Sequence, residues 1–301
     1  MTSRRALTVS AMVIWAAVAV TAAPRALSHR HSPTVLPSVD FPAETCADLH
    51  IRFDHRDTVL QSEDRTITKA EAPTLRVHAE SNGGVYVVGW DKDAYAVTLC
   101  KAAEAGSDAS ALLSQIHLSF RNGDLRISAP NSNERWAAHL LIRSPKSSAL
   151  DLQVNNGPMT LYHVDGNLRV RAENGPVTVT GCTGELDLGS QNGPLTLEEN
   201  SGKQTVRSEN GPLSLLLSGR SWEGSGLDAH STNGPVTLQV PSGYTSGVVL
   251  ESDGYGPFQC NASVCSEGRK TWDDDHKRVE FGSGPTIVRV STVNGPVSVA
   301  N

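Results

Sequence analysis

The triplet Asn-Gly-Pro recurs along this chain, and its spacing constrains the fold more than any other feature. The 301-residue sequence contains six copies, and the first four begin 18 residues apart. A fixed period of this kind indicates a structural unit that stacks on copies of itself. The predicted turn residues are Asn156-Gly157-Pro158, Asn174-Gly175-Pro176, Asn192-Gly193-Pro194, Asn210-Gly211-Pro212, Asn233-Gly234-Pro235 and Asn294-Gly295-Pro296.

Each unit also contains a second glycine, so that glycines recur every nine residues from Gly157 to Gly211. After each glycine, apolar residues stand at the second and fourth positions with a polar residue between them, as at Val177 and Val179. Gln204 is the one exception. This alternation predicts short β-strands with one buried face. The density of glycine argues against helix.

Proline distinguishes between two arrangements of these strands. Asn-Gly is typical of two-residue hairpins between antiparallel strands, but the next residue must then donate its N–H, and proline has none. We therefore predict an all-β fold, a parallel β-solenoid with coils of about 18 residues. Each coil has two strands and two corners, where Asn and Gly take the unusual backbone angles.

Stacking of such coils places residue i beside residue i+18. One outer face then carries a candidate contact ladder of Thr160, Thr178, Thr196 and Ser214, which Thr237 and Ser298 continue. Such a row of hydroxyls suits a glycan, another β-edge or ice, although threonine is also an ordinary outward strand residue. The opposite face brings Arg169 beside Asp187.

The domain organisation follows from the repeat. Residues 29–44 form a Pro-rich leader, and residues 45–301 form a single elongated domain with regular repeats over 150–240. The part from Cys46 to Pro145 is more irregular and is interpreted as degenerate coils. Residues 244–283 form a loop-rich insertion, after which the repeat resumes.

The N-terminus predicts export. Arg4 and Arg5 precede an uncharged run, and we place cleavage of a signal peptide, residues 1–28, after Ser28. Loss of its three arginines takes the net charge from −6 to −9, which disfavours nucleic acid as a partner. We expect no membrane anchor after cleavage, and a location in the periplasm, on the cell surface or outside the cell.

Five cysteines in an exported chain indicate disulfides and one free thiol. The candidate pairs are Cys260 with Cys265 and Cys46 with Cys100, which leaves Cys182. Other pairings remain open, because spacing does not fix connectivity. No zinc-ligand spacing is present.

The pattern resembles a bacterial family of adhesin-like domains of unknown function. The resemblance runs from Ile142-Arg143-Ser144-Pro145 through the regular repeats to Phe281-Gly282-Ser283-Gly284 and Val293-Asn294-Gly295-Pro296-Val297-Ser298-Val299. It implies a β-solenoid of the adhesin type and supplies no catalytic residues. This chain departs from the family in the proline after nearly every Asn-Gly and in its cysteine loop.

The most enzyme-like cluster is Asp273, Asp274, Asp275 and His276 after Trp272. Carboxylates can bind calcium or hydrolyse glycosides, but a run of consecutive charges is more typical of a solvated loop. His163 and His230 have no nucleophile at a recognisable spacing. We therefore predict no catalytic residues, metal or cofactor.

These observations favour a non-enzymatic binding or scaffold protein of the cell envelope, with an envelope protein or a carbohydrate as its partner. The alternatives are a polysaccharide-active β-helix enzyme and a structural envelope protein that self-associates through its open coil ends.

Overall fold

A computed structural model describes residues 34–35, 43–53, 57–130, 135–273 and 275–301, which belong to one compact unit, Pro33–Asn301. The expected signal peptide and most of the expected leader lie outside these residues. No helix in the described part has the length and hydropathy of a membrane span.

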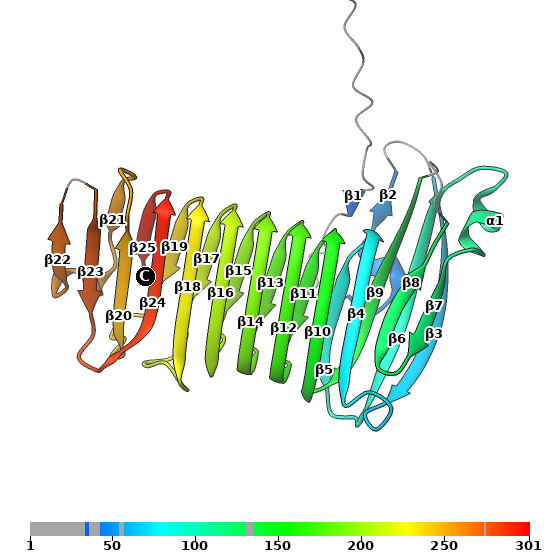
Figure 1. Ribbon diagram of the computed structural model, residues 1–301, viewed down its shortest axis with the longest axis horizontal. Coiled ribbons are helices and arrows are strands. Elements are labelled where there is room, and N and C mark those ends of the chain that lie inside the picture. Colours follow the sequence, from blue (N-terminus) through cyan, green and yellow to red (C-terminus); the bar gives the residue numbers. More distant parts are fainter. Residues whose placement is uncertain (1–33, 36–42, 54–56, 131–134, 274) are drawn as a thin grey trace, which may run out of the picture. The chain divides into compact units, whose positions relative to one another are not determined.

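The regular repeats form pairs of strands, one long and one short in each unit. The long strands are β10 (Ser147–Asn156), β12 (Asp165–Asn174), β14 (Thr183–Asn192), β16 (Lys203–Asn210) and β18 (Gly226–Asn233), and the short strands are β11 (Met159–Tyr162), β13 (Val177–Thr180), β15 (Leu195–Glu198), β17 (Leu213–Leu216) and β19 (Val236–Gln239). Long strands pair in parallel with long strands, and short with short (Figure 1). Residue i faces residue i+18, as in the pair Leu168 and Leu186, which agrees with the predicted neighbours.

The core lies between the two layers of strands. The alternating apolar residues of each unit point inward and are almost completely buried, as are Val177 and Val179. Gln204 occupies one of these inward positions and is also buried, with 2% of its surface exposed. Its side-chain amide donates to the Ser201 carbonyl at 3.0 Å.

Glycine is required at the Asn-Gly-Pro corners for two reasons. Gly193 has a φ of 136°, and a Cβ placed on it would lie 2.3 Å from the Gly175 carbonyl oxygen of the neighbouring unit. The six asparagines, in contrast, are absent from the described residues with positive φ. The prediction that Asn shares the unusual backbone angles is therefore wrong.

The asparagine side chains instead form a continuous ladder across the units. Five hydrogen bonds join the six asparagines, and in each the Nδ2 donates to the Oδ1 of the preceding asparagine at 3.0–3.2 Å. The Asn ladder consists of Asn156, Asn174, Asn192, Asn210, Asn233 and Asn294. Amides serve here because each carries both a donor and an acceptor.

The N-terminal part differs from the predicted degenerate coils. Its strands are β3 (Thr58–Thr68), β4 (Thr74–Asn82), β5 (Val85–Trp90), β6 (Ala94–Glu104), β7 (His117–Arg121), β8 (Asp124–Ser128) and β9 (Trp136–Pro145), with a short helix α1 (Ala109–Leu113). β4 and β5 continue the parallel pairing from β10 and β11, and β8 and β9 extend it by one more strand in each sheet. β6 is antiparallel to β3 and β9.

β7 and β8 form another antiparallel pair, and the residues of the turn between them explain it. Asn122 and Gly123 join β7 to β8 and both have positive φ, 53° and 83°. This is the two-residue hairpin turn that Asn-Gly favours when the next residue can donate its N–H. The next residue here is Asp124 rather than proline.

The region predicted as a loop-rich insertion contains four strands joined by irregular segments. It contains β20 (Gly247–Ser252), β21 (Phe258–Cys260), a 3₁₀ turn η2 (Ser263–Ser266), β22 (Arg269–Trp272) and β23 (Lys277–Phe281), and β24 (Thr286–Asn294) and β25 (Val297–Ala300) follow. β20 and β21 bury Val248, Leu250 and Phe258. The strands of this region were not predicted, because they lack the Asn-Gly-Pro spacing that marks the other units.

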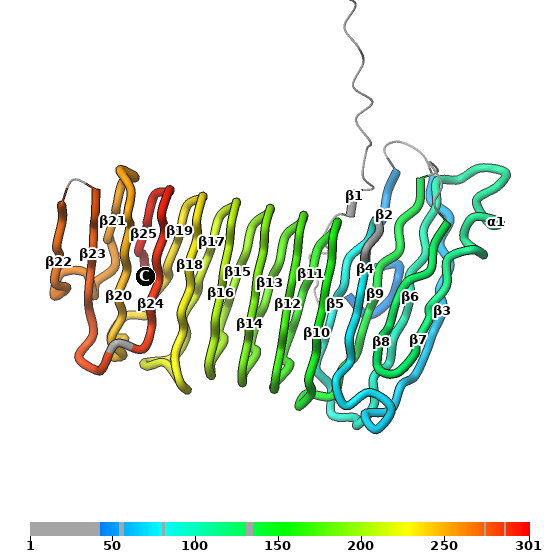
Figure 2. The backbone as a smooth tube through the Cα atoms, in the orientation of Figure 1, coloured from blue at the N-terminus to red at the C-terminus, as the bar shows by residue number. Residues whose placement is uncertain are grey.

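The strands form two large sheets, mostly parallel and neither of them closed. The 12-stranded sheet has the order β22-β23-β20-β24-β18-β16-β14-β12-β10-β4-β8-β7, and the 11-stranded sheet has the order β21-β25-β19-β17-β15-β13-β11-β5-β9-β6-β3. The backbone trace shows the last strands, in red, between the yellow and the orange strands (Figure 2).

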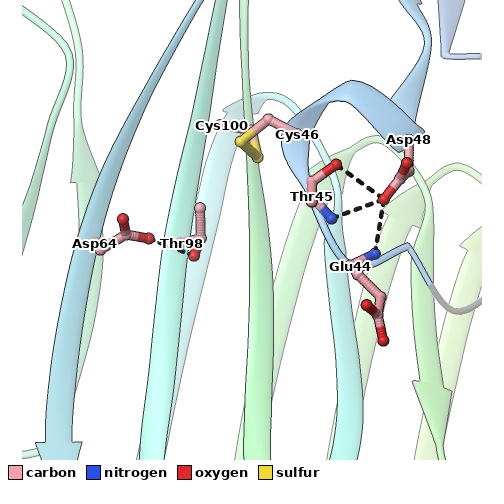
Figure 3. The surroundings of a disulfide bond; sticks show 7 residues. All are labelled: Glu44, Thr45, Cys46, Asp48, Asp64, Thr98 and Cys100. Atoms are coloured by element: carbon pink, nitrogen blue, oxygen red, sulfur yellow. Dashed lines mark hydrogen bonds between the residues drawn. A yellow bond between two sulfur atoms is a disulfide. The ribbon is translucent and has the colours of Figure 1, made fainter.

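Both candidate disulfides are present, Cys46–Cys100 and Cys260–Cys265. The first attaches a 3₁₀ turn η1 (Cys46–Leu49) to β6, and Asp48 accepts hydrogen bonds from Glu44 and Thr45 beside it (Figure 3). These bonds lower the pKa of Asp48. The adjoining β2 (Ile51–Arg52) pairs with β1 (Thr34–Val35). This segment buries a second hydrophobic cluster, which includes Leu49, Phe53, Tyr86 and Leu141.

Candidate functional site: the outer face of the 11-stranded sheet

The short strands present an outer face that is almost uncharged. In the six described strands β11, β13, β15, β17, β19 and β25, the outward positions fall into two rows. The first, the hydroxyl row, is Thr160, Thr178, Thr196, Ser214, Thr237 and Ser298, and the second is Tyr162, Thr180, Glu198, Leu216, Gln239 and Ala300. Glu198 is the only charged residue in either row of these strands.

The members of the hydroxyl row are direct register partners from one strand to the next. All six are half-buried, and parallel strands lie about 4.8 Å apart. Four of them are threonines, whose branched side chains have restricted rotamers. The row therefore offers hydroxyl donors and acceptors at a regular spacing in a fixed geometry.

The long strands present a charged outer face. Ion pairs link neighbouring strands there: Arg171 with Asp187 at 2.5 Å, Lys203 with Glu185 at 2.7 Å and Arg207 with Asp228 at 2.8 Å. These pairs are partly or largely exposed, so each contributes little to stability.

The predicted partner of Asp187 needs correction. Arg169 is its register neighbour, but Arg171 makes the ion pair. The Arg171 guanidinium also donates to the Asp187 carbonyl oxygen at 2.8 Å, and its side chain lies over Gly189, where a Cβ would be 3.2 Å from Cδ. Arginine can reach a carboxylate and a carbonyl together because its donors form a planar fork.

The difference in charge makes the two faces unequal as contact surfaces. Covering the face of the long strands would remove many charged groups from water, and that desolvation opposes binding. The cores of protein interfaces are correspondingly depleted in charge. The face of the short strands has the lower desolvation cost.

The acidic cluster is dispersed. The His276 Nδ1 pairs with the Asp253 Oδ1 at 2.7 Å, and Asp273 and Asp275 are exposed. Asp274 lies outside the described residues. Among those residues, no group of three or more His, Cys, Asp or Glu side chains is placed to hold a metal ion.

The other predicted residues have structural surroundings. His163 is at a corner with a φ of 51° and packs against Tyr162, and the His230 Nδ1 is 2.9 Å from the Ser291 hydroxyl. Cys182 is the free cysteine and is buried. Burial raises the pKa of its thiol to about 11, so the reactive thiolate is scarce at neutral pH.

One buried polar group in the N-terminal part was not predicted from the sequence. His139, on β9, is 1% exposed, and its Nδ1 accepts a hydrogen bond from the Gly84 N–H at 2.8 Å. Burial lowers its pKa to about 4. Only the apolar stretch around it, Trp136 to Ile142, signals that this histidine is inside.

The fold is all-β, and its short strands present a nearly uncharged outer face. No family model and no curated protein matches the chain. Among solved structures, it is similar to a proposed cell adhesion protein from Clostridium sporogenes (13% identity, 80% of this chain and 99% of that one, TM-score 0.35). It is also similar to a proposed adhesin from Bacteroides fragilis (14%, 81% and 97%, 0.37) and a proposed lipid-binding protein from Parabacteroides distasonis (11%, 82% and 98%, 0.26).

Proposed function

We propose that this chain is an exported, non-enzymatic binding protein of the cell envelope, and that a neutral carbohydrate polymer lies on the hydroxyl row. In this proposal residues 1–28 are a signal peptide, residues 29–44 are a leader, and residues 45–301 are a single domain whose regular repeats, 150–240, form a parallel β-solenoid. The two disulfides support export, because such bonds persist in oxidising compartments.

The observation that carries the proposal is the contrast in charge between the two outer faces. A polysaccharide is rich in hydroxyls, so it can exchange hydrogen bonds with water for hydrogen bonds with Thr160, Thr178, Thr196 and Ser214. A neutral polymer gains nothing from the charged face. The repeated spacing of the row suits a ligand that is itself a repeating polymer.

The experiment measures retention of the mature protein on insoluble neutral polysaccharides, such as chitin and cellulose, with alginate as an anionic comparison. Replacing both Thr178 and Thr196 by Lys is expected to weaken binding at least roughly tenfold. The bound polymer would cover two lysine charges, and their desolvation opposes binding. Retention of the unsubstituted protein should change little with salt, since screening acts on charges.

The matched control replaces both Thr205 and Thr232 by Lys, because each is a half-buried threonine on the outer face of a long strand, β16 and β18 respectively. This variant should bind as the unsubstituted protein does. Equal loss in both variants would assign the effect to folding or net charge. No retention on any neutral polymer would exclude this ligand class.

The acidic cluster gives the enzyme alternative its test. If Asp273 and Asp275 were catalytic, purified protein would degrade a polysaccharide, and alanine at either position would abolish that activity without unfolding the protein. We expect no turnover.

For the third alternative, self-association through open sheet ends, charge disfavours like-to-like pairing at the ends of the 12-stranded sheet. The two edge strands of the 12-stranded sheet, β22 and β7, carry Arg269 and Lys270 at one end and Arg121 at the other. Like charges placed directly opposite each other destabilise a strand pair.

A further inference from the structure

The last unit of the chain, β24 and β25, does not lie at the end of the sheets. β24 lies between β18 and β20, and β25 lies between β19 and β21 (Figure 1). Because β20 and β21 precede the last unit in the sequence, the unit occupies a slot whose two walls come from earlier parts of the chain. We define the slot as the space between β18–β19 and β20–β21.

The first wall pairs with the last unit in the same way as one regular unit pairs with the next. β24 is parallel to β18 and β25 is parallel to β19. Asn294 donates to the Asn233 Oδ1 at 3.1 Å and so continues the Asn ladder. Val288 and Val290 of the last unit are buried.

The second wall pairs with the opposite edge of the same strands. β20 is parallel to β24, with Leu250 beside Val290, and β21 is parallel to β25, with Phe258 beside Val297. The final residue, Asn301, contacts both walls: its Nδ2 donates to the Val240 carbonyl at 3.0 Å, and its Oδ1 accepts from the Ser263 N–H at 2.8 Å.

The connection into the slot is short and lightly held. It runs from Phe281, the end of β23, to Thr286, the start of β24. Gly282 has a φ of 88°, and the Ser283 and Gly284 N–H groups donate to the Thr245 carbonyl at 3.1 and 3.2 Å. A cleft of about 760 Å³, lined in part by Gly243, Gly282 and Gly284, flanks it.

We propose that the slot also accepts the last unit of a second copy of this chain, so that two copies exchange their C-terminal units. Every contact that holds the unit in its own slot is available unchanged in the slot of an identical chain, and such exchange is a low-cost route to a dimer. The free-energy cost of exchange is confined to the connection, residues 282–285, where the turn must become extended.

The length of the connection fixes the geometry of the pair. Residues 282–285, fully extended, span at most about 14 Å. The slot of the second copy must therefore open toward this same corner, and the two connections cross near a twofold axis. The cleft beside Gly282 leaves room for the crossing.

The experiment uses full-length mature chains in which Cys182 is replaced by alanine and the native disulfides stay oxidised. Thr237 and Ser298 are register partners on the outer face, and neighbouring strands lie about 4.8 Å apart, within the range of a disulfide. Chains carrying Thr237→Cys alone and Ser298→Cys alone are mixed, refolded together at high concentration and oxidised. Exchange predicts a covalent two-chain product, several-fold more abundant than in the control mixture.

The control mixture replaces Thr237→Cys by Thr178→Cys, which is on the same row but is not a neighbour of Ser298. A third chain carries both Thr237→Cys and Ser298→Cys, cross-linked before refolding. It should remain monomeric where the unsubstituted chain forms dimers.

Cross-linking no greater than in the control mixture would overturn the proposal. A dimer of the third chain, in which positions 237 and 298 of the same chain are already cross-linked, would overturn it as well, because another surface would then hold that dimer. Neither result tests the separate proposal that a carbohydrate binds the hydroxyl row.

Discussion

His139 shows how one side chain can make the stability of this fold depend on pH. It is buried among apolar residues on β9 and accepts the Gly84 N–H. A protonated imidazole has no lone pair to accept this bond and would also place a charge in the core. The native protein therefore keeps His139 neutral over a wider range of pH than the unfolded chain does.

The sign of the pH effect follows from the lowered pKa. The pKa is about 4 in the folded protein, compared with 6.5 as the ordinary value, so below pH 6.5 the unfolded chain binds a proton that the native state excludes. We expect His139 to remove about 3 kcal/mol of unfolding free energy as the pH falls from 6.5 to 4, and little more at lower pH, where the native state also binds the proton. Urea denaturation across this range measures it.

His139→Gln isolates this contribution, because glutamine can accept the same hydrogen bond without titrating. Its unfolding free energy should decline less steeply between pH 6.5 and 4 than that of the unsubstituted protein. His117→Gln, at an exposed position on β7, should leave the slope unchanged. Parallel slopes for all three proteins would contradict the assignment.

At the scale of strands and corners, the sequence predicted the regular region well. Apolar alternation identified the strands, and proline after Asn-Gly excluded hairpins, because both signals are local to each unit. The role of asparagine was not predictable in this way. Its amide bonds join different units, and a one-dimensional repeat shows that a residue recurs without showing which of its atoms is used.

The hydrogen bonds of the Asn ladder predict how much stability is lost when an asparagine in its interior is replaced. Asn192 donates to Asn174 at 3.1 Å and accepts from Asn210 at 3.2 Å, so Asn192→Ala loses two bonds. We expect a loss of about 1–2 kcal/mol in unfolding free energy, at the lower end because the side chains are exposed. Chemical denaturation measures the change.

Asn156 provides the comparison, because it lies at the end of the ladder and accepts one of these bonds. Asn156→Ala should cost about half as much. Asn192→Gln should be nearly as destabilising as alanine, since the longer side chain moves the amide off the ladder. An unaffected Asn192→Gln variant would show that the ladder contributes little.

For the whole molecule, the sequence predicted both disulfides but not the order of the last strands. Strand order failed for a physical reason: Val248 and Leu250 of β20 present the same apolar pair as Val288 and Val290 of β24. Either strand would fit against β18, so the choice depends on connections that alternation does not record. The antiparallel pairing of the N-terminal strands was not predicted either, because it also depends on connections that alternation does not record.

The two disulfides close loops of different length, and this gives a prediction for the stability of the whole fold. Cys46 and Cys100 are 54 residues apart, whereas Cys260 and Cys265 are 5 apart. In the chain-entropy model, the longer loop constrains the unfolded chain more. Replacing Cys46 and Cys100 by alanine should cost about 4 kcal/mol, and replacing the other pair about 2 kcal/mol.

Thermal and chemical denaturation of the two double variants would measure these values. The short-loop variant is the control for the loss of a disulfide as such. Equal losses would mean that loop length does not set the contribution and that the packing of the segment around Leu49 and Phe53 dominates instead.

The corner glycine, the ladder asparagine and the outward hydroxyl all belong to the same unit, so one unit is also a natural increment for gene duplication. Adding or deleting a whole unit would lengthen or shorten the hydroxyl row and keep every strand in phase, whereas a shift by one residue would turn each buried side chain outward. Between Asn210 and Asn233 the ladder already spans 23 residues in place of 18, with the excess at a corner. Unequal recombination within the repeats would therefore change the length of the hydroxyl row during evolution without requiring a new fold.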